Sequence, residues 1–303
     1  MAKLTVMKGT KYDRKRLLQW LEEDGAVVVQ TKRDEIRCKV NIDDDNVVTY
    51  TSAQGKPLYN LSCFDAMWVH VATSSGIYEF DTGVCVNESF DLTKRTVRAS
   101  KKQYDLTGNS IHTIEDKKKG YYFSGTLEAR FYLYDLPTAK APYENRRIVM
   151  CELASLFPEL YVPETYIATS EYDVDEYYRH MVEAGHEGTM IKRVDYDYVY
   201  GRTVCWMKMK PEEERDGEVI GYVEGQGKYE GLIGSVKVRF VDGSTTAISG
   251  MSDGLRADIS ERREEYIGRI VEVRFMQRDS DGGYRHPRFY RWHPDKDTLE
   301  GSE

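Results

Sequence analysis

Lysines alternate with apolar residues along two short, strand-like segments of this chain. Lys192 ends the segment "EGTMIK", and Lys208 and Lys210 lie close behind it in "WMKMKP". Residues two apart on a β-strand share a face, so Lys208 and Lys210 share one with Trp206, and Lys192 shares one with Met190. Ammonium groups stacked about 7 Å apart repel each other unless water or an anion lies before them. A polyphosphate fits such a face, although lysines on an exposed edge strand give the same pattern.

Another lysine has the setting of a nucleophile. Lys32 follows the apolar run Val27 to Val29 and stands beside Arg33, within "KRDEIR". A lysine at the end of a buried strand, close to other cations, has its ammonium form disfavoured and its free amine increased. Such an amine can attack an electrophile, whereas the simpler interpretation of these letters is a charged turn.

The hydrophobic pattern predicts the elements that position these side chains. Helical spacing indicates a helix in residues 12–25 that ends at Gly25, a second in 143–158, and a third in 173–186. The third is expected to begin at Asp173 or Asp175 and to end at Gly185. Runs rich in β-branched and aromatic residues predict antiparallel strands, in residues 26–32, 36–42, 46–52, 67–73, 76–87, 121–137, 188–194 and 204–210.

The pattern changes after Pro211 and the polar segment "EEERDGE". Three strand-like runs, one helix and a further strand follow, in residues 218–225, 234–241, 244–250, 254–268 and 269–277. This order is typical of a small OB-fold barrel, which often holds nucleic acid. We therefore expect an α+β chain, with antiparallel sheets and flanking helices in residues 1–212 and an OB-fold β-barrel in residues 213–303.

Composition limits the class of protein. The 303 residues are 40% hydrophobic and 31% charged, a balance typical of a soluble globular protein. No long apolar run or secretory signal is present, so we expect a cytoplasmic protein, in the host cell if the chain is viral. The five cysteines lack zinc spacing and are expected to be reduced. A net charge of −8 disfavours a nucleic-acid partner unless the basic segments 92–102, 117–119 and 284–292 gather on one face.

Taken in order, these segments resemble the covalent nucleotidyltransferase superfamily, and most closely the compact ATP-dependent DNA ligases of short-tailed bacteriophages. "KRDEIR" approximates the first motif, K-x-D-G-x-R; "EGTMIK" matches the fourth, E-G-x-x-x-K; and "WMKMKP" matches the fifth, K-x-K-P after an aromatic residue. The resemblance implies an adenylation domain followed by an OB-fold domain. It also implies a ligase that uses ATP and Mg²⁺ to seal 5′-phosphate, 3′-hydroxyl nicks in double-stranded DNA, in replication and repair. Such a ligase would be a monomer and would not associate with a membrane.

The resemblance also implies roles for particular residues. Lys32 takes AMP from ATP as a phosphoramidate, Tyr134 in "LYDLP" stacks on adenine unless it is a core tyrosine, and Glu187 is a metal or ribose-side carboxylate. The ATP-binding residues implied are Arg37, Tyr134, Glu187, Lys192, Lys208 and Lys210. In the C-terminal segment "YRHPRFYR" the bases expected to meet DNA are Arg285, Arg288 and Arg291, with Arg288 the first choice.

The chain departs from the family pattern at three positions. Glu35 replaces the glycine of the first motif, Ala53 replaces an arginine, and Gly83 replaces the glutamate expected as the ribose and metal carboxylate. We expect Asp81, or failing that Glu79, to supply a metal carboxylate from the same strand. The last motif, R-x-D-K, is matched only loosely by "RWHPDK".

Two other classes of function remain open from the sequence. An RNA ligase or a GTP-using capping enzyme would use the same lysine and the same two lysine strands, and a ligase-like nucleic-acid binder without catalysis would share the fold. Labelling with ATP or GTP, followed by nicked DNA or nicked RNA, separates the first group. A covalent AMP on the purified protein separates the second.

Overall fold

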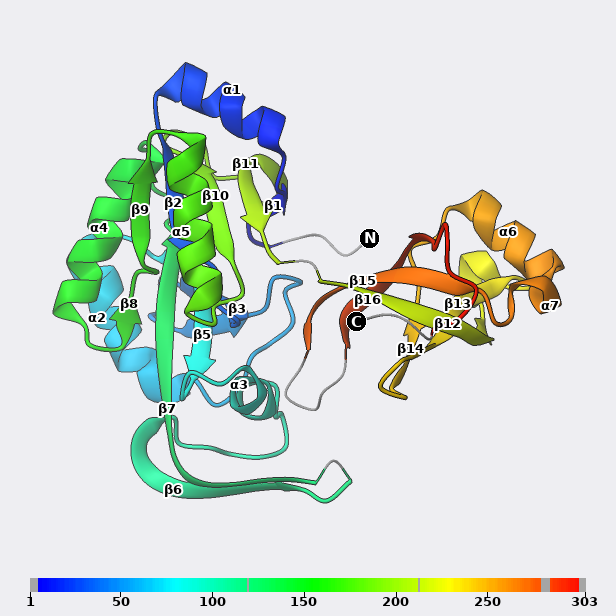
Figure 1. Ribbon diagram of the computed structural model, residues 1–303. Helices are drawn as coiled ribbons and strands as arrows, with labels where there is room; N and C mark the ends of the chain where they lie inside the picture. Colours follow the sequence, from blue (N-terminus) through cyan, green and yellow to red (C-terminus); the bar gives the residue numbers. More distant parts are fainter. Residues whose placement is uncertain (1–4, 119, 212, 279–283, 300–303) are drawn as a thin grey trace. The chain divides into compact units, whose positions relative to one another are not determined.

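The computed structural model describes residues 5–118, 120–211, 213–278 and 284–299, without the side chains of 276–278, 285 and 286. The chain divides into two compact units, Met1–Met209 and Lys210–Glu303 (Figure 1). No helix in the described parts of the chain is long and apolar enough to cross a bilayer.

The first sheet of the first unit has five strands in the order β1-β11-β10-β2-β9. They are β1 (Lys8–Lys11), β2 (Val27–Thr31), β9 (Thr165–Ala168), β10 (Thr189–Arg193) and β11 (Arg202–Met209). β2, β10 and β11 pair antiparallel, whereas β1 joins β11 in parallel at one edge. This pairing places the segment that ends at Lys32 beside β10, with β11 next in the sheet.

The second sheet has the order β4-β3-β5-β7-β6, with β8 paired to β7. Its strands are β3 (Ile36–Ile42), β4 (Val48–Thr51), β5 (Glu79–Val86), β6 (Thr107–Asp116), β7 (Tyr121–Asp135) and β8 (Leu160–Tyr161). β6 and the first part of β7 extend beyond the body of the unit as a two-stranded ribbon (Figure 1).

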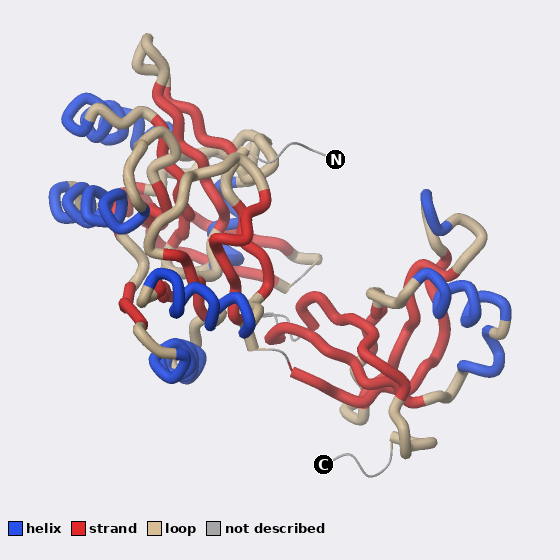
Figure 2. The backbone as a smooth tube through the Cα atoms, turned by 90° about the horizontal axis from the view of Figure 1, so that it is seen from above, coloured by secondary structure: helices blue, strands red, loops and turns tan. Residues whose placement is uncertain are grey.

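Helices lie around the strands of this unit, as the blue and red segments of Figure 2 show. They are α1 (Arg14–Asp24), α2 (Asp65–Ser75), α3 (Phe90–Val97), α4 (Tyr143–Leu156) and α5 (Glu171–Glu183), with a short 3₁₀ helix at Ser62–Phe64. β2 shows how the two faces of the first sheet are used. Val27 and Val29 pack with residues of α1 and α5, whereas Val28 packs into the main core with residues of the second sheet. The face opposite α1 and α5 therefore looks toward the interior of the unit.

Two expectations about local structure were wrong. Residues 67–73 form part of α2 and not a strand, because Trp68, Val71 and Ala72 are buried at helical spacing against the sheet and outweigh the β-branched composition. The third helix begins after Ser170, which caps it, and Asp173 completes a capping box from the third helical position. The first helix ends as predicted, with Gly25 at φ 73°.

The second unit is a curved five-stranded sheet in the order β14-β13-β12-β15-β16. Its elements are β12 (Glu213–Glu224), the 3₁₀ helix Gly227–Tyr229, β13 (Ile233–Phe240), β14 (Thr245–Ile248), α6 (Asp253–Glu261), α7 (Arg263–Tyr266), β15 (Ile270–Arg278) and β16 (Tyr284–Trp292). The two edges approach each other, since Phe289 of β16 donates its N–H to the Ser249 carbonyl beyond β14 (2.7 Å). The sheet encloses a separate apolar core, so the predicted α+β fold with an OB-like barrel is confirmed.

Candidate active site

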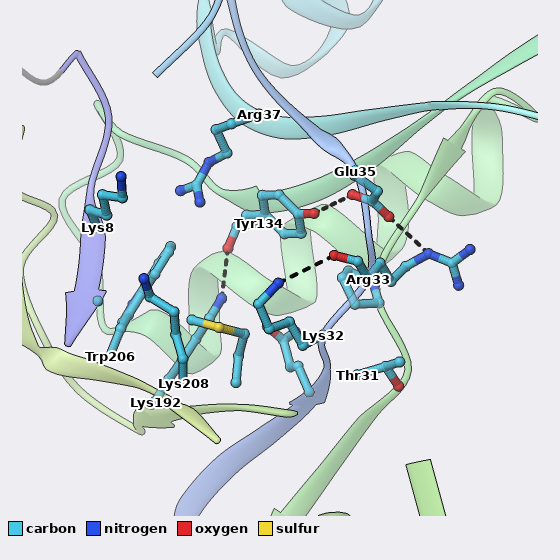
Figure 3. Close-up of a pocket in the computed structure, with 14 residues that line it drawn as sticks. Lys8, Thr31, Lys32, Arg33, Glu35, Arg37, Tyr134, Lys192, Trp206 and Lys208 are labelled. Carbon is cyan, nitrogen blue, oxygen red and sulfur yellow. Dashed lines mark hydrogen bonds and ion pairs between the residues drawn. The ribbon is translucent and has the colours of Figure 1, made fainter. Parts of the chain in front are cut away.

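A pocket opens on the interior face of the first sheet (Figure 3). The side chains that line it come from both sheets and from the segment between β2 and β3. They are Lys8, Gly9, Gln30, Thr31, Lys32, Arg33, Glu35, Arg37, Tyr134, Pro163, Met190, Lys192, Trp206 and Lys208. Six of these fourteen residues are lysine or arginine and one is acidic, so the lining favours an anionic ligand.

Lys32 lies directly after β2, where its backbone N–H donates to the Gly188 carbonyl (2.8 Å). Its ammonium group forms an ion pair with the carboxylate of Glu187, and both side chains are largely buried. In the sequence Lys32 stands directly before Arg33, near other cations. The fold adds a carboxylate partner from a distant segment, which favours the ammonium over the free amine. The amine can react only after this proton has left, and the Glu187 carboxylate is the acceptor in contact with it.

Lys192 and Lys208 project from one face of two adjacent strands. In the antiparallel register Met190 lies opposite Lys208, and Lys192 lies opposite Trp206. Residues directly opposite in such a pair share a face, which explains why all four line the pocket. The alternation noted in the sequence therefore has the arrangement expected of a lining.

Lys192 is the most deeply buried of these lysines, with 1% of its surface exposed. Its Nζ donates to the Tyr134 carbonyl (3.1 Å) and to the Tyr143 hydroxyl (2.8 Å), and it lies 4.2 Å from the centre of the Trp206 ring. Burial lowers the pKa of Lys192 to about 7, because a low-dielectric setting disfavours the charged form. The Lys192 amine therefore changes between its charged and neutral forms near neutral pH.

Lys208 and Lys210 differ in position, although their spacing predicted that they share a strand face. Lys208 is half-buried and lines the pocket. Lys210 is also half-buried, but it lies after the end of β11 and is not among the residues that line the pocket. The structure therefore brings Lys32, Lys192 and Lys208 together and does not bring Lys210 into the same lining.

Arg37 is anchored by Asp81. The guanidinium forms a two-pronged ion pair with the Asp81 carboxylate and donates to the Met7 carbonyl (3.1 Å). Asp81 is fully buried and also accepts a hydrogen bond from the Tyr198 hydroxyl (2.6 Å). Both carboxylate oxygens are thereby occupied, so Asp81 fixes Arg37 at the pocket wall and is poorly placed to bind a metal ion.

A magnesium ion bound in this pocket would therefore need a carboxylate other than Asp81. The described residues contain no cluster of three or more histidine, cysteine or acidic side chains that could hold a metal. Magnesium bound to nucleotides needs no such cluster, because it keeps several waters and takes one or two carboxylates together with substrate phosphates. Glu187, which contacts Lys32 beside the pocket, fits that limited role, whereas Asp81 does not.

Tyr134 lies on the pocket wall beneath Arg37, whose guanidinium is 4.8 Å from the centre of its ring. The next residue, Asp135, is fully buried and is held by Arg146 (2.6 Å) and Tyr196 (2.8 Å), which fixes the end of β7. Tyr134 donates its hydroxyl to Glu35. It is therefore a firmly positioned aromatic side chain of the pocket, as adenine stacking would require.

Glu35 contributes the acidic group of the lining. Its side chain is 2% exposed, and its Oε1 lies 2.8 Å from Nε of Arg33. Burial raises the pKa of Glu35 to about 7, although the Tyr134 hydrogen bond and the Arg33 charge act in the opposite direction. Arg33 is itself held over the ring of Tyr132 (4.0 Å) and by Glu88.

Comparison with protein families decides the identity. Residues 10–210 match the ATP dependent DNA ligase domain, and residues 224–293 match the DNA ligase OB-like domain. The chain belongs to the ATP-dependent DNA ligase family. The resemblance inferred from the three motifs is thereby confirmed.

Individual relatives of this ligase differ in how much of their length it spans. It is 25% identical to the DNA ligase of Enterobacteria phage T3, over 92% of this chain and 93% of the phage protein. It is 32% identical to the DNA ligase of Methanothrix thermoacetophila over 49% of this chain, but it spans only 30% of that protein. The chain thus spans nearly all of the phage protein and less than a third of the Methanothrix protein.

Solved structures share the fold of this ligase. A Lig E DNA ligase superposes with a TM-score of 0.71, at 20% identity, over 95% of this chain and 98% of the other. The ATP-dependent DNA ligase of bacteriophage T7, in complex with ATP, superposes with a TM-score of 0.58, at 20% identity, over 96% of this chain and 99% of the other. Both likenesses extend through the two units.

Lining residues that were not predicted from the sequence include Lys8, Gln30 and Glu35. Lys8 belongs to β1, whose parallel pairing with β11 has no local signal. Gln30 looked like part of an ordinary strand, and its buried amide bonds Thr165 (3.0 Å). Glu35 was noted only as a departure from the motif. Each is placed by pairing between distant segments, which the local pattern does not encode.

The arginines expected to bind DNA belong to the second unit of the ligase. Arg291 is exposed and pairs with Glu272 (2.8 Å), opposite which it lies in the β15–β16 register. Arg288 is half-buried on the same strand, and its backbone forms an isolated parallel β-bridge with Ser249. Arg285 also belongs to β16, but its side chain lies outside the described residues.

Proposed function

We propose that this ligase seals 5′-phosphate, 3′-hydroxyl nicks in double-stranded DNA through a covalent lysyl-AMP intermediate formed from ATP. The observation that carries the proposal is the position of Lys32, which lies directly after β2 in a cationic pocket shared with Lys192 and Lys208. A lysine amine among phosphate-binding cations is the arrangement that nucleotidyl transfer needs. We further propose that the protein acts as a monomer in the cytoplasm of the host cell, in replication and repair.

The steps follow from the side chains. The Lys32 ammonium gives up its proton, for which the Glu187 carboxylate is the acceptor in contact with it. The amine attacks the α-phosphorus of ATP and pyrophosphate leaves. AMP then passes from Lys32 to the DNA 5′-phosphate, and the 3′-hydroxyl displaces AMP. Lys192 and Lys208 bind the negative charge that moves through each step.

Magnesium has a limited place in this proposal. Carried by the triphosphate, with Glu187 as its protein carboxylate, it would neutralise phosphate charge. Asp81 is not proposed as a ligand because Arg37 and Tyr198 occupy its oxygens.

The decisive experiment is intact-mass analysis after incubation with ATP or with GTP. We expect one AMP on the protein from ATP and no adduct from GTP, and nicked DNA should then be sealed in preference to nicked RNA. An adduct from GTP would favour a capping-type enzyme, and preference for nicked RNA would favour an RNA ligase. The absence of any adduct would leave a nucleic-acid binder without catalysis.

Proton uptake should accompany ATP binding at Lys192. With a pKa near 7, its amine is charged below about pH 7 and neutral above it. A bound phosphate favours the ammonium, so ATP binding at pH 8 should take up a proton, and affinity should fall by at most about tenfold per unit as the pH rises above 7. Calorimetry in buffers of different ionisation enthalpy measures the uptake. Lys192→Met should reduce the uptake, and the part that remains should disappear when Glu35→Gln is added, because the pKa of Glu35 is also about 7; equal uptake in Lys192→Met and wild type would contradict the prediction.

Binding to nicked DNA should depend steeply on salt despite the acidic net charge. If the barrel binds DNA phosphates, a chain ending at residue 212 should bind nicked duplex more weakly than the full chain. The slope of log affinity against log salt concentration should also be smaller, by about 0.9 for each phosphate that the barrel neutralises in the full chain. Within the full chain, Arg288→Ala and Arg291→Ala should each reduce the slope. Arg239→Ala is the matched control, because Arg239 is exposed and paired with Glu218 as Arg291 is with Glu272. Equal affinities and slopes for full-length and shortened chains would remove the barrel from the DNA site.

A further inference from the structure

Gly83 is a buried glycine in the middle of β5, with strands on both sides. It pairs with Arg37 of β3 and with Tyr132 of β7. Its φ lies outside the left-handed region, so the backbone there does not require glycine. What requires glycine is space. A Cβ at position 83 would overlap Oε2 of Glu35 and the hydroxyl oxygen of Tyr134.

Glu35 therefore occupies the volume that a side chain at position 83 would take. It reaches this volume from the segment between β2 and β3, three residues after Lys32. Two of the three positions that depart from the family pattern, the glutamate at 35 and the missing glutamate at 83, therefore meet at one point in space. A carboxylate is therefore present in the pocket, but Glu35 supplies it from the segment between β2 and β3, and not position 83 from β5.

The surroundings of Glu35 indicate which part of a nucleotide it can meet. Its carboxylate repels phosphate, so the triphosphate must lie toward Lys192 and Lys208. Arg33, 2.8 Å from Oε1, disfavours a second cation such as a metal ion at this carboxylate. Oε1 is buried and accepts no hydrogen bond from the described residues, so the partner that it lacks is a neutral donor. The charge of Lys32 acts on Glu35, and the α-phosphorus that Lys32 attacks is linked to the sugar.

We propose that Glu35 accepts a hydrogen bond from a sugar hydroxyl of the bound nucleotide, and that Gly83 is present to leave room for it. This inference rests on the proposed function, because it assumes that the pocket binds ATP. It makes Glu35 a substrate-binding residue that selects ribose, and it makes positions 35 and 83 interdependent. Neither change alone should be tolerated, whereas exchanging the two residues should be.

The test is a four-protein cycle of wild type, Glu35→Gly, Gly83→Glu and the exchanged double variant. Adduct formation is measured at low concentrations of ATP, 2′-deoxyATP and 3′-deoxyATP. We expect each single variant to lose about 10- to 100-fold with ATP, the range for a hydrogen bond to a charged group, and the double variant to recover most of this. Wild type and the double variant should prefer ATP to one deoxy analogue, and Glu35→Gly should lose that preference.

Two controls separate this inference from effects on folding and from the proposed function itself. Sealing of a nick that already carries AMP needs no ATP and should persist in all four proteins. Glu88→Gln removes the other carboxylate that contacts Arg33 and should leave the ribose preference unchanged. Unaltered ribose preference in Glu35→Gly, or additive losses in the double variant, would overturn the inference. Failure of the wild type to form any adduct would instead overturn the proposed function.

Discussion

Replacing Lys32 with alanine should abolish the covalent AMP adduct and the sealing of ordinary nicks, while DNA already adenylated at its 5′-phosphate is still joined. The reason is that only formation of the lysyl-AMP and its transfer require the amine. In the last step the 3′-hydroxyl displaces AMP from the DNA, with the phosphate-binding lysines still in place. Intact-mass analysis and a gel assay with pre-adenylated nicks measure the two activities separately.

Matched variants show whether Lys32 acts as the nucleophile or only as a positive charge in the pocket. Lys32→Arg keeps the charge but offers no free amine, because guanidinium does not lose its proton, so it too should form no adduct. Lys8→Ala removes a different cation from the same lining and should slow adduct formation without abolishing it. A labelled protein in the Lys32→Ala variant would show that another residue is the nucleophile.

Replacing Lys208 with alanine should slow adduct formation by about 10² to 10³, which corresponds to about 2 to 4 kcal/mol for a charged contact to phosphate in the transition state. The fold should survive, since Lys208 is half-buried at the pocket and is not part of the apolar core. Single-turnover kinetics with saturating ATP measure the rate, and a thermal melt checks the fold.

Lys11→Ala is the matched control for this variant. Lys11 pairs in register with Lys208 from the neighbouring strand, but it is exposed and not among the residues that line the pocket. It should therefore keep nearly the wild-type rate. A folded Lys208→Ala protein with wild-type adduct formation would exclude β11 from the phosphate site.

The sequence by itself determined the family and most of the central strands, but it did not predict β1, α3, β6 or β16. The three lysine motifs depend on residue type at fixed short spacing, and the alternation along β10 and β11 follows from the two-residue period of a strand. The segment 67–73 shows the limit of local patterns. Its β-branched residues favoured a strand, but burial of Trp68 and Val71 against a sheet decided for helix.

Only the tertiary structure decided which side chains meet. Lys32 and Glu187 are 155 residues apart, and they form an ion pair because β2 and β10 are neighbours in one sheet. Asp81 had the residue type of a metal ligand, but the pairing of β3 with β5 places Arg37 against it. The carboxylate of Glu35 lies where Gly83 leaves space, which two separate departures in a linear motif could not show. Contacts of this kind depend on strand register and on the volume left between strands, and both are set by packing of the whole unit.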